Sequence, residues 1–231
     1  MFKNILKQKL LLIASFVLLV LFVGLMILLK NVDVKEIGLS NTAVGLATVN
    51  ERFFNSIGVS DTFDKITDIL LVLSFGVVGF MAFLGLYRLI KYKKLDLTLV
   101  VLGVFYTIMF ALYVIFDTIH FNYSPILETG EPKESFVSSH VLCALFVFLS
   151  SIIIININIT NNKLKLCSVI VMALLSILMV VFRLLSGRHW FTDIVGGELL
   201  ALLLVLLFAL VVATLKTRVI EFGKKDEKEL H

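Results

Sequence analysis

Long apolar runs alternate with short polar segments along the whole chain. A helix needs about 20 apolar residues, at 1.5 Å of rise each, to cross the hydrocarbon core of a bilayer. Five uncharged runs approach or reach this length, and a sixth does so when it is extended to include Glu198 near one boundary. The six runs are 10–29, 69–87, 97–116, 141–160, 166–182 and 194–215. The pattern predicts an all-α, polytopic membrane protein with six transmembrane helices.

The polar segments between the runs alternate in charge. Most of the 21 basic residues precede the first run or follow the second, fourth and sixth runs. They are Lys3, Lys7, Lys9, Arg88, Lys91, Lys93, Lys94, Lys163, Lys165, Lys216, Arg218, Lys224, Lys225 and Lys228. Because cytoplasmic segments of membrane proteins are enriched in Lys and Arg, we expect both termini to be cytoplasmic. Segments 31–65, 118–138 and 184–193 then face outward.

Composition agrees with a lipid environment. Apolar residues make up 59% of the chain and charged residues 16%, whereas soluble domains have roughly 45–50% and 25%. This argues against a soluble domain, a disordered chain or a nucleic-acid-binding arm. The first run has no small-residue cleavage pattern after it, so we expect it to remain as a helix. Without a transit peptide, the plasma membrane is the expected location.

The chain divides into three expected parts. Residues 1–65 hold the first helix and an outward segment in which Phe53 and Phe54 lie among polar residues, which suggests an interfacial helix. That helix would serve packing or membrane anchoring, or it would guide a lipid substrate. Residues 66–215 form the helical core. Residues 216–231 form a charged cytoplasmic tail that we expect to be frayed.

Candidate chemistry gathers in two of the outward segments. If the sixth helix begins near His189, Asp193 lies four residues later on the same helical face and can accept a hydrogen bond from the imidazole. Such a carboxylate orients a histidine nucleophile and raises its basicity. The alternative interpretation is a salt bridge at the helix start.

A second group of polar residues precedes the fourth helix. Ser138 is positioned to cap that helix, and the free backbone N–H groups of a helix start favour an anion. His140 could then donate a proton to a leaving oxygen. Arg183 and Arg188, in the other segment, have the planar guanidinium that suits a phosphate. The alternatives are a plain serine cap, an interfacial histidine and arginines that snorkel to the membrane surface.

Together these residues resemble the phosphatidic acid phosphatase type 2 family, integral-membrane lipid phosphatases that share a helical core with vanadium-dependent haloperoxidases. Arg183, His189 and Asp193 match the family's third motif, Arg-x5-His-x3-Asp, without a gap. Segment 137–140, Val-Ser-Ser-His, keeps the serine and histidine of the second motif, Pro-Ser-Gly-His, and lacks its proline and glycine. The resemblance spans roughly residues 66–215.

The resemblance implies roles for these residues. His189 would be the nucleophile that forms a phosphohistidine, Asp193 would orient it, and His140 would be the acid for the leaving alcohol. Arg183, the Ser138 hydroxyl and the Ser139 backbone N–H would hold the phosphate oxygens. The family requires no metal or organic cofactor, so none is expected here.

The first motif, Lys-x6-Arg-Pro, is where the chain departs from the family. The nearest segment puts Ser124 before Pro125 in place of arginine, and Asp117 in place of lysine. Lys133 and Arg188 are the candidates to replace the two missing cations. His120 is a further candidate cation near pH 6.

The favoured function is therefore a lipid phosphatase that acts at the outer membrane face on a phosphomonoester or pyrophosphate. Candidate substrates are phosphatidate, phosphatidylglycerol phosphate and polyprenyl pyrophosphate carriers such as undecaprenyl pyrophosphate. A catalytically degenerate member that binds phosphorylated lipids, a small transporter, and a metal site made by His140, His189 and Asp193 are the alternatives. Membrane lipids are the expected surroundings, no nucleic acid is expected as a partner, and the sequence does not determine the oligomeric state.

Overall fold

The computed structural model describes residues 2–36, 43–93, 95–119, 121–126 and 133–229. These residues form seven α-helices and one two-stranded antiparallel sheet. The helices are α1 (Phe2–Asn31), α2 (Ala47–Ile57), α3 (Asp61–Tyr92), α4 (Leu97–Thr118), α5 (Ser139–Asn158), α6 (Asn162–Ser186) and α7 (Phe191–Glu229). Six of them, all except α2, are long and apolar enough to cross a membrane, which confirms the predicted set. The protein is a multi-pass membrane protein.

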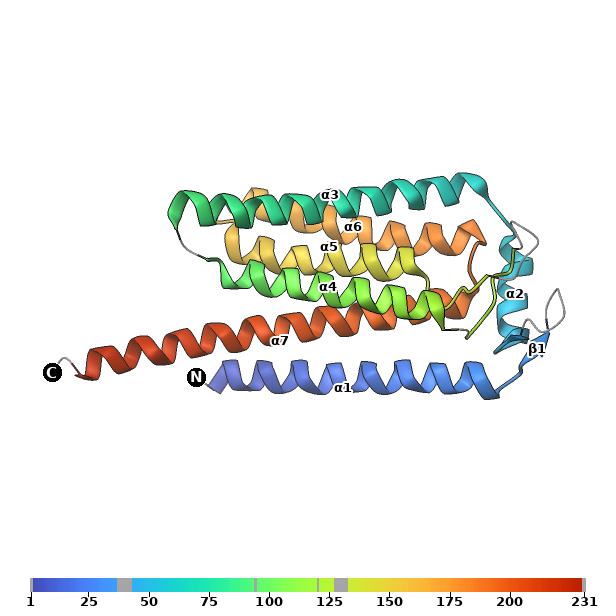
Figure 1. Ribbon diagram of the computed structural model, residues 1–231, viewed down its shortest axis with the longest axis horizontal. Helices are drawn as coiled ribbons and strands as arrows, with labels where there is room; N and C mark the ends of the chain where they lie inside the picture. Colours follow the sequence, from blue (N-terminus) through green and yellow to red (C-terminus); the bar gives the residue numbers. More distant parts are fainter. Residues whose placement is uncertain (1, 37–42, 94, 120, 127–132, 230–231) are drawn as a thin grey trace.

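The six long helices lie side by side with α5 in the middle (Figure 1). Helix α5 packs against α3, α4, α6 and α7, and 67% of its most apolar stretch is buried, against 11% for α1 and for α6. The outer helices instead expose large apolar side chains such as Phe16, Val72 and Leu166. Exposure of this kind is costly in water and is expected where a side chain faces lipid. The beginning of α1 and the end of α7 lie at one end of the bundle, and α2 lies across the other end (Figure 1).

Helix α3 begins at Asp61, eight residues before the apolar run that predicted it. The Ser60 hydroxyl caps the helix by accepting a hydrogen bond from the Phe63 backbone N–H at 3.5 Å. Asp61 and Asp64 occupy the first turn, where carboxylates are favoured by the helix dipole. Hydropathy therefore located the membrane span and missed the acidic turns that precede it.

Two further differences concern the ends of the apolar runs. Helix α7 continues to Glu229, so the prediction of a frayed tail is wrong for the backbone of this segment. Residues 216–229 contain no proline and several Lys and Glu, which favour a helix. Strands β1 (Lys35–Glu36) and β2 (Ala43–Val44) were not predicted because two-residue strands carry no detectable alternation.

The predicted interfacial helix is α2, and it packs against the beginning of α7. The ring of Phe53 stacks on Phe191 with centroids 4.2 Å apart, and Phe54 lies 5.6 Å from Trp190. The buried Asn50 donates to the Thr192 hydroxyl at 2.9 Å and accepts from the Thr192 backbone N–H at 3.2 Å. These contacts support the packing interpretation of this helix, and they join it to the segment that carries the candidate site.

Candidate active site

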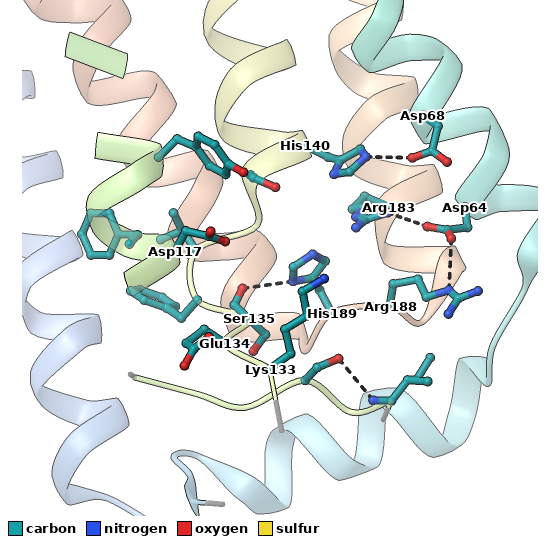
Figure 2. Close-up of a pocket in the computed structure, with 17 residues that line it drawn as sticks. Asp64, Asp68, Asp117, Lys133, Glu134, Ser135, His140, Arg183, Arg188 and His189 are labelled. Carbon is teal, nitrogen blue, oxygen red and sulfur yellow. Dashed lines mark hydrogen bonds and ion pairs between the residues drawn. The ribbon is translucent and has the colours of Figure 1, made fainter. Parts of the chain in front are cut away.

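A polar cavity of about 520 Å³ lies near the end of the bundle where α2 is found (Figure 2). Its walls come from α3, α4, the segment leading into α5, the end of α6 and the turn before α7. Its lining includes six of the eight predicted site residues, namely Lys133, Ser139, His140, Arg183, Arg188 and His189. The two polar segments in which the candidate chemistry gathers therefore meet at one cavity.

His189 lies in the turn just before α7, two residues before the helix begins at Phe191. Its Nδ1 atom is 3.0 Å from the Ser135 carbonyl oxygen (Figure 2). The same atom is 3.7 Å from Asp193 Oδ2. A carbonyl oxygen only accepts, so in this hydrogen bond Nδ1 carries the proton and donates it to Ser135. The predicted carboxylate–imidazole hydrogen bond is therefore replaced by one to a backbone carbonyl, because the ring sits outside the helical geometry that the spacing assumed.

The charge state of His189 follows from its surroundings. Burial lowers the pKa of His189 below its ordinary value, the Arg183 guanidinium acts in the same direction, and Asp193 and the Ser135 carbonyl oppose them. The ring is consequently neutral near pH 7. With the proton on Nδ1, Nε2 keeps its lone pair, which is the form that a nucleophile needs.

Asp193 is fully buried behind His189 and held by two donors. Its Oδ1 atom accepts from the Asn122 side-chain amide at 3.0 Å, and its Oδ2 atom accepts from the Trp190 backbone N–H at 3.0 Å. The Asp193 backbone carbonyl also accepts from the Ser138 N–H at 3.0 Å. Asp193 thus ties the start of α7 to the start of α5 and stays within 3.7 Å of the His189 ring.

Ser138 is the N-cap residue of α5, and its predicted capping hydrogen bond is absent. Its hydroxyl is buried and has no partner within the described residues. Ser138 is 0% exposed and does not line the cavity. Ser139, one residue later, does line the cavity.

His140 lies in the first turn of α5 and faces α3. Its Nε2 atom is 2.9 Å from Asp68 Oδ1 (Figure 2). Its Nδ1 atom is buried without a hydrogen-bond partner in the described part of the chain. One imidazole nitrogen is therefore engaged by a carboxylate while the ring borders the cavity.

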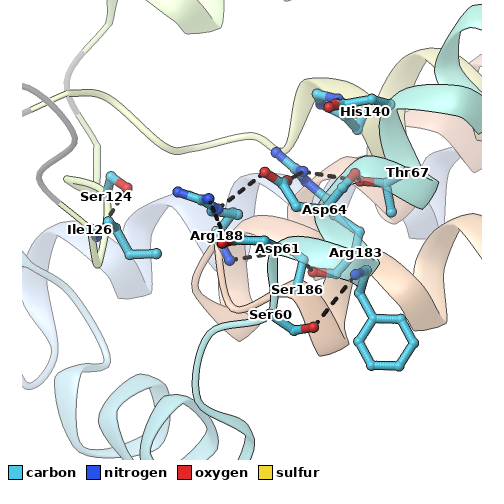
Figure 3. A network of polar contacts seen from close by, with 12 residues as sticks. Ser60, Asp61, Asp64, Thr67, Ser124, Ile126, His140, Arg183, Ser186 and Arg188 are labelled. Atoms are coloured by element: carbon cyan, nitrogen blue, oxygen red, sulfur yellow. Dashed lines mark hydrogen bonds and ion pairs between the residues drawn. The ribbon is translucent and has the colours of Figure 1, made fainter.

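The two arginines converge on one carboxylate (Figure 3). Arg183, which is 6% exposed, donates from Nη1 to Asp64 Oδ1 at 2.6 Å and to the Thr67 hydroxyl at 3.1 Å. Arg188 contacts Asp64 Oδ2 with Nε at 3.1 Å and donates from Nη2 to Asp61 Oδ1 at 2.8 Å. Both guanidinium groups are thereby fixed at the cavity wall.

Comparison with known proteins bears directly on this helical core. Residues 122–217 match the model of the PAP2 superfamily, the phosphatidic acid phosphatase type 2 proteins. The resemblance to the PAP2 superfamily is confirmed. The matched segment runs from Asn122, which holds Asp193, through both histidines and into α7.

A solved PAP2 structure has the same fold. It is described as the crystal structure of the first transmembrane PAP2-type phosphatidylglycerolphosphate phosphatase from Bacillus subtilis. The alignment covers 84% of this chain and 94% of that one, with a TM-score of 0.58 and 18% sequence identity. No curated protein matches the chain in sequence. The structural likeness concerns the fold, which extends beyond the matched residues 122–217 to the earlier helices.

The positions assigned to the first PAP2 motif also border the cavity. Asp117 and Ser124 both line it, although they replace lysine and arginine. Lys133, a proposed substitute cation, lines it as well, whereas Arg188 is occupied by Asp61 and Asp64. His120 lies outside the described residues.

Sequence reasoning missed the contribution of α3 to this cavity. Asp64 and Asp68 line the cavity and pair with Arg183, Arg188 and His140. The available signal was the spacing of Asp61, Asp64 and Asp68, which share one helical face. The signal was hidden because the second apolar run, which predicts this helix, begins only at residue 69. The carbonyl of Ser135 was also missed, since any residue type can supply a backbone acceptor.

Proposed function

We propose that the protein is a lipid phosphate phosphatase that works through a phosphohistidine at His189. The observation that carries this proposal is the meeting of a neutral His189, a second histidine and two fixed guanidinium groups in one cavity. The PAP2 match and the fold of the Bacillus subtilis phosphatase support a phosphatase in general. The proposal extends this to the mechanism, the membrane face and the class of substrate.

The first step is an in-line attack on phosphorus. The lone pair on His189 Nε2 forms the N–P bond while the bond from phosphorus to the leaving oxygen breaks, and His140 gives its proton to that oxygen. Arg183 and the Ser139 backbone N–H stabilise the charge on the phosphoryl oxygens. Asp193 and the Ser135 carbonyl hold the His189 ring during the attack.

In the second step, water hydrolyses the phosphohistidine. His140, now neutral, accepts a proton from the water as its oxygen attacks phosphorus, and the N–P bond breaks to release inorganic phosphate and regenerate His189. Neither step requires a metal ion, so we expect activity to persist with a chelator present.

A phosphorylated lipid is the favoured substrate class because the cavity lies among helices whose outer surfaces are apolar. A long-chain substrate can keep its chains in the bilayer and present its phosphate to the cavity. Phosphatidate, phosphatidylglycerol phosphate and polyprenyl pyrophosphates such as undecaprenyl pyrophosphate meet this requirement. The basic segments at the opposite end of the bundle favour an extracytoplasmic cavity in the plasma membrane.

A second candidate is a protein that binds phosphorylated lipids without hydrolysing them. The observation that favours it is that Asp117 and Ser124 line the cavity where PAP2 proteins have lysine and arginine. Each charged hydrogen bond to phosphate is worth about 1.5–3 kcal/mol, so losing two could stop turnover before it stops binding.

Phosphate release separates these candidates. Purified wild-type protein and His189→Ala are incubated with each lipid phosphate in the presence of a chelator. We expect release by the wild type and a loss of at least about 1,000-fold in the variant, since covalent catalysis depends on this nitrogen. Equal, slow release by both proteins would refute catalysis at this site and favour the binding role. An accessibility tag near residue 130 tests the membrane face, because labelling only from the cytoplasm would contradict an outward cavity.

A further inference from the structure

Carboxylates are unusually abundant in a cavity proposed to hold phosphate. Asp64, Asp68, Asp117 and Glu134 all line it. A carboxylate near a phosphate opposes binding unless its charge is already committed to a neighbouring cation or imidazole. The contacts of Asp64 and Asp68 show such commitments, and they differ in kind.

Asp64 is engaged by the two arginines at the cavity wall. Its two oxygens contact Arg183 at 2.6 Å and Arg188 at 3.1 Å, and Asp61 holds the far side of Arg188 at 2.8 Å (Figure 3). These pairs neutralise charge and restrain two long side chains. Helix α3 therefore acts as a support for groups that come from the end of α6 and the turn after it.

Asp68 lies one helical turn after Asp64 and contacts the proposed acid. Its carboxylate is 2.9 Å from His140 Nε2, although the two residues are 72 positions apart in the chain. Asp68 is 58% exposed while the His140 side chain is only 17% exposed. A carboxylate accepts, so Nε2 is the protonated nitrogen in this pair, and Nδ1 is the nitrogen that has no partner within the described residues.

We propose that Asp68 is a positioning residue for His140, an inference that rests on the proposed function. The carboxylate accepts the Nε2–H and holds the ring, and in the imidazolium form Nδ1 carries the second proton, which is the one available to the substrate. As the bond from phosphorus to the leaving oxygen breaks, its electron pair goes to that oxygen, which takes the proton from Nδ1. The imidazolium becomes a neutral imidazole that stays bound to Asp68, so the same nitrogen can receive the proton of the attacking water.

The experiment compares two leaving groups in wild type, Asp68→Asn and a control. An alkyl phosphate lipid needs a proton on its leaving oxygen, whereas 4-nitrophenyl phosphate releases a stable anion that needs none. We expect Asp68→Asn to lower kcat for the lipid by about 10- to 100-fold and to lower kcat for 4-nitrophenyl phosphate much less. Glu51→Gln, which removes an exposed carboxylate from α2, should leave both rates unchanged. A loss that is equal for both substrates would overturn the proposal, because a purely structural role does not depend on the leaving group.

A double-mutant cycle tests whether Asp68 acts through His140. Asp68→Asn should have no further effect on lipid hydrolysis in the His140→Ala background, and independent, multiplying losses would refute the assignment. A readout that needs no activity is the ¹⁵N spectrum of His140 in the purified protein. We expect a protonated Nε2 in the wild type, and a neutral ring protonated only at Nδ1 would overturn the proposal. Absence of lipid hydrolysis by the wild type would instead refute the proposed function, while the spectrum would still decide the role of Asp68.

Discussion

The turn between α6 and α7 gives the sharpest prediction for stability. Gly187 ends α6 with a φ of +66°, and it precedes Arg188 and His189 directly. A Cβ atom at this position would lie 2.0 Å from the Gly58 carbonyl oxygen and 3.2 Å from the Val59 Cα atom. Both contacts are with backbone, so no side-chain rotation can relieve them. The Gly187→Ala substitution must therefore displace the segment that leads into α3.

The magnitude has two parts. An L-residue in the left-handed conformation costs about 1–2 kcal/mol. Overpacking against a backbone that must shift costs about 1–3 kcal/mol. We therefore expect the free energy of unfolding to fall by about 2–5 kcal/mol, which corresponds to roughly 4–20 °C in Tm for a chain of this size. Beside this turn, the Ser60 backbone N–H donates to the Ser186 carbonyl oxygen at 3.1 Å. A displaced turn also moves the site residues that directly follow it, so lipid phosphatase activity should fall as well.

Thermal unfolding in detergent provides the assay. Trp190 is the single tryptophan of the chain and is 2% exposed next to His189, so its fluorescence reports the loss of structure at this turn. Gly79→Ala is the matched control, since Gly79 lies within α3 and has no atom within 4 Å of the added Cβ. The control should be neutral or raise stability by up to about 1 kcal/mol. A Gly187→Ala protein with a Tm within about 2 °C of wild type would refute the packing argument.

Three other predictions follow from the site. The pKa of His189 is lowered and its neutral form is the nucleophile. We therefore expect kcat/KM to stay high as pH falls from 7 and to decline with a midpoint below about 6.5. A midpoint clearly above that value in a pH–rate profile would contradict the assignment. The same shift means that the unfolded chain binds this proton more readily, so the free energy of unfolding should decrease as pH falls below about 6.5. Asn122→Leu removes the donor to Asp193 Oδ1 and should lower the free energy of unfolding by at least about 2 kcal/mol. Thermal unfolding measures this change, and an unchanged Tm would show that the hydrogen bond is dispensable.

The membrane fold was largely predictable because its main determinant acts locally. A run of apolar residues partitions into lipid whatever the rest of the chain does, so six helices could be located from the sequence. Their ends were less predictable. The acidic first turns of α3 belong to the helix because of a Ser60 cap and the helix dipole, and neither contributes to hydropathy.

The candidate residues Arg183, His189, Asp193 and His140 could be selected from spacing and residue type alone, but their hydrogen-bond partners could not. Spacing suggested that Asp193 would receive the His189 ring proton, whereas the ring turns to the carbonyl of Ser135, 54 positions away. The serine cap failed for a similar reason, since the Ser138 backbone is held by Asp193. In each case a tertiary contact outcompeted the local geometry that the pattern assumed.

The sequence by itself therefore determined that this protein lies in a lipid bilayer, how many membrane helices it has and which residue types are available for phosphate chemistry. Tertiary structure decided which of those residues face one cavity, and which carboxylate each cation and histidine contacts. The physical reason is the difference in sequence separation between the residues that take part in each kind of interaction. Transfer of apolar side chains into lipid depends on neighbouring residues along one helix, whereas the pairs of Asp64 with Arg183 and Asp68 with His140 join helices 119 and 72 positions apart. Such pairs exist only once α3, α5 and α6 have packed together.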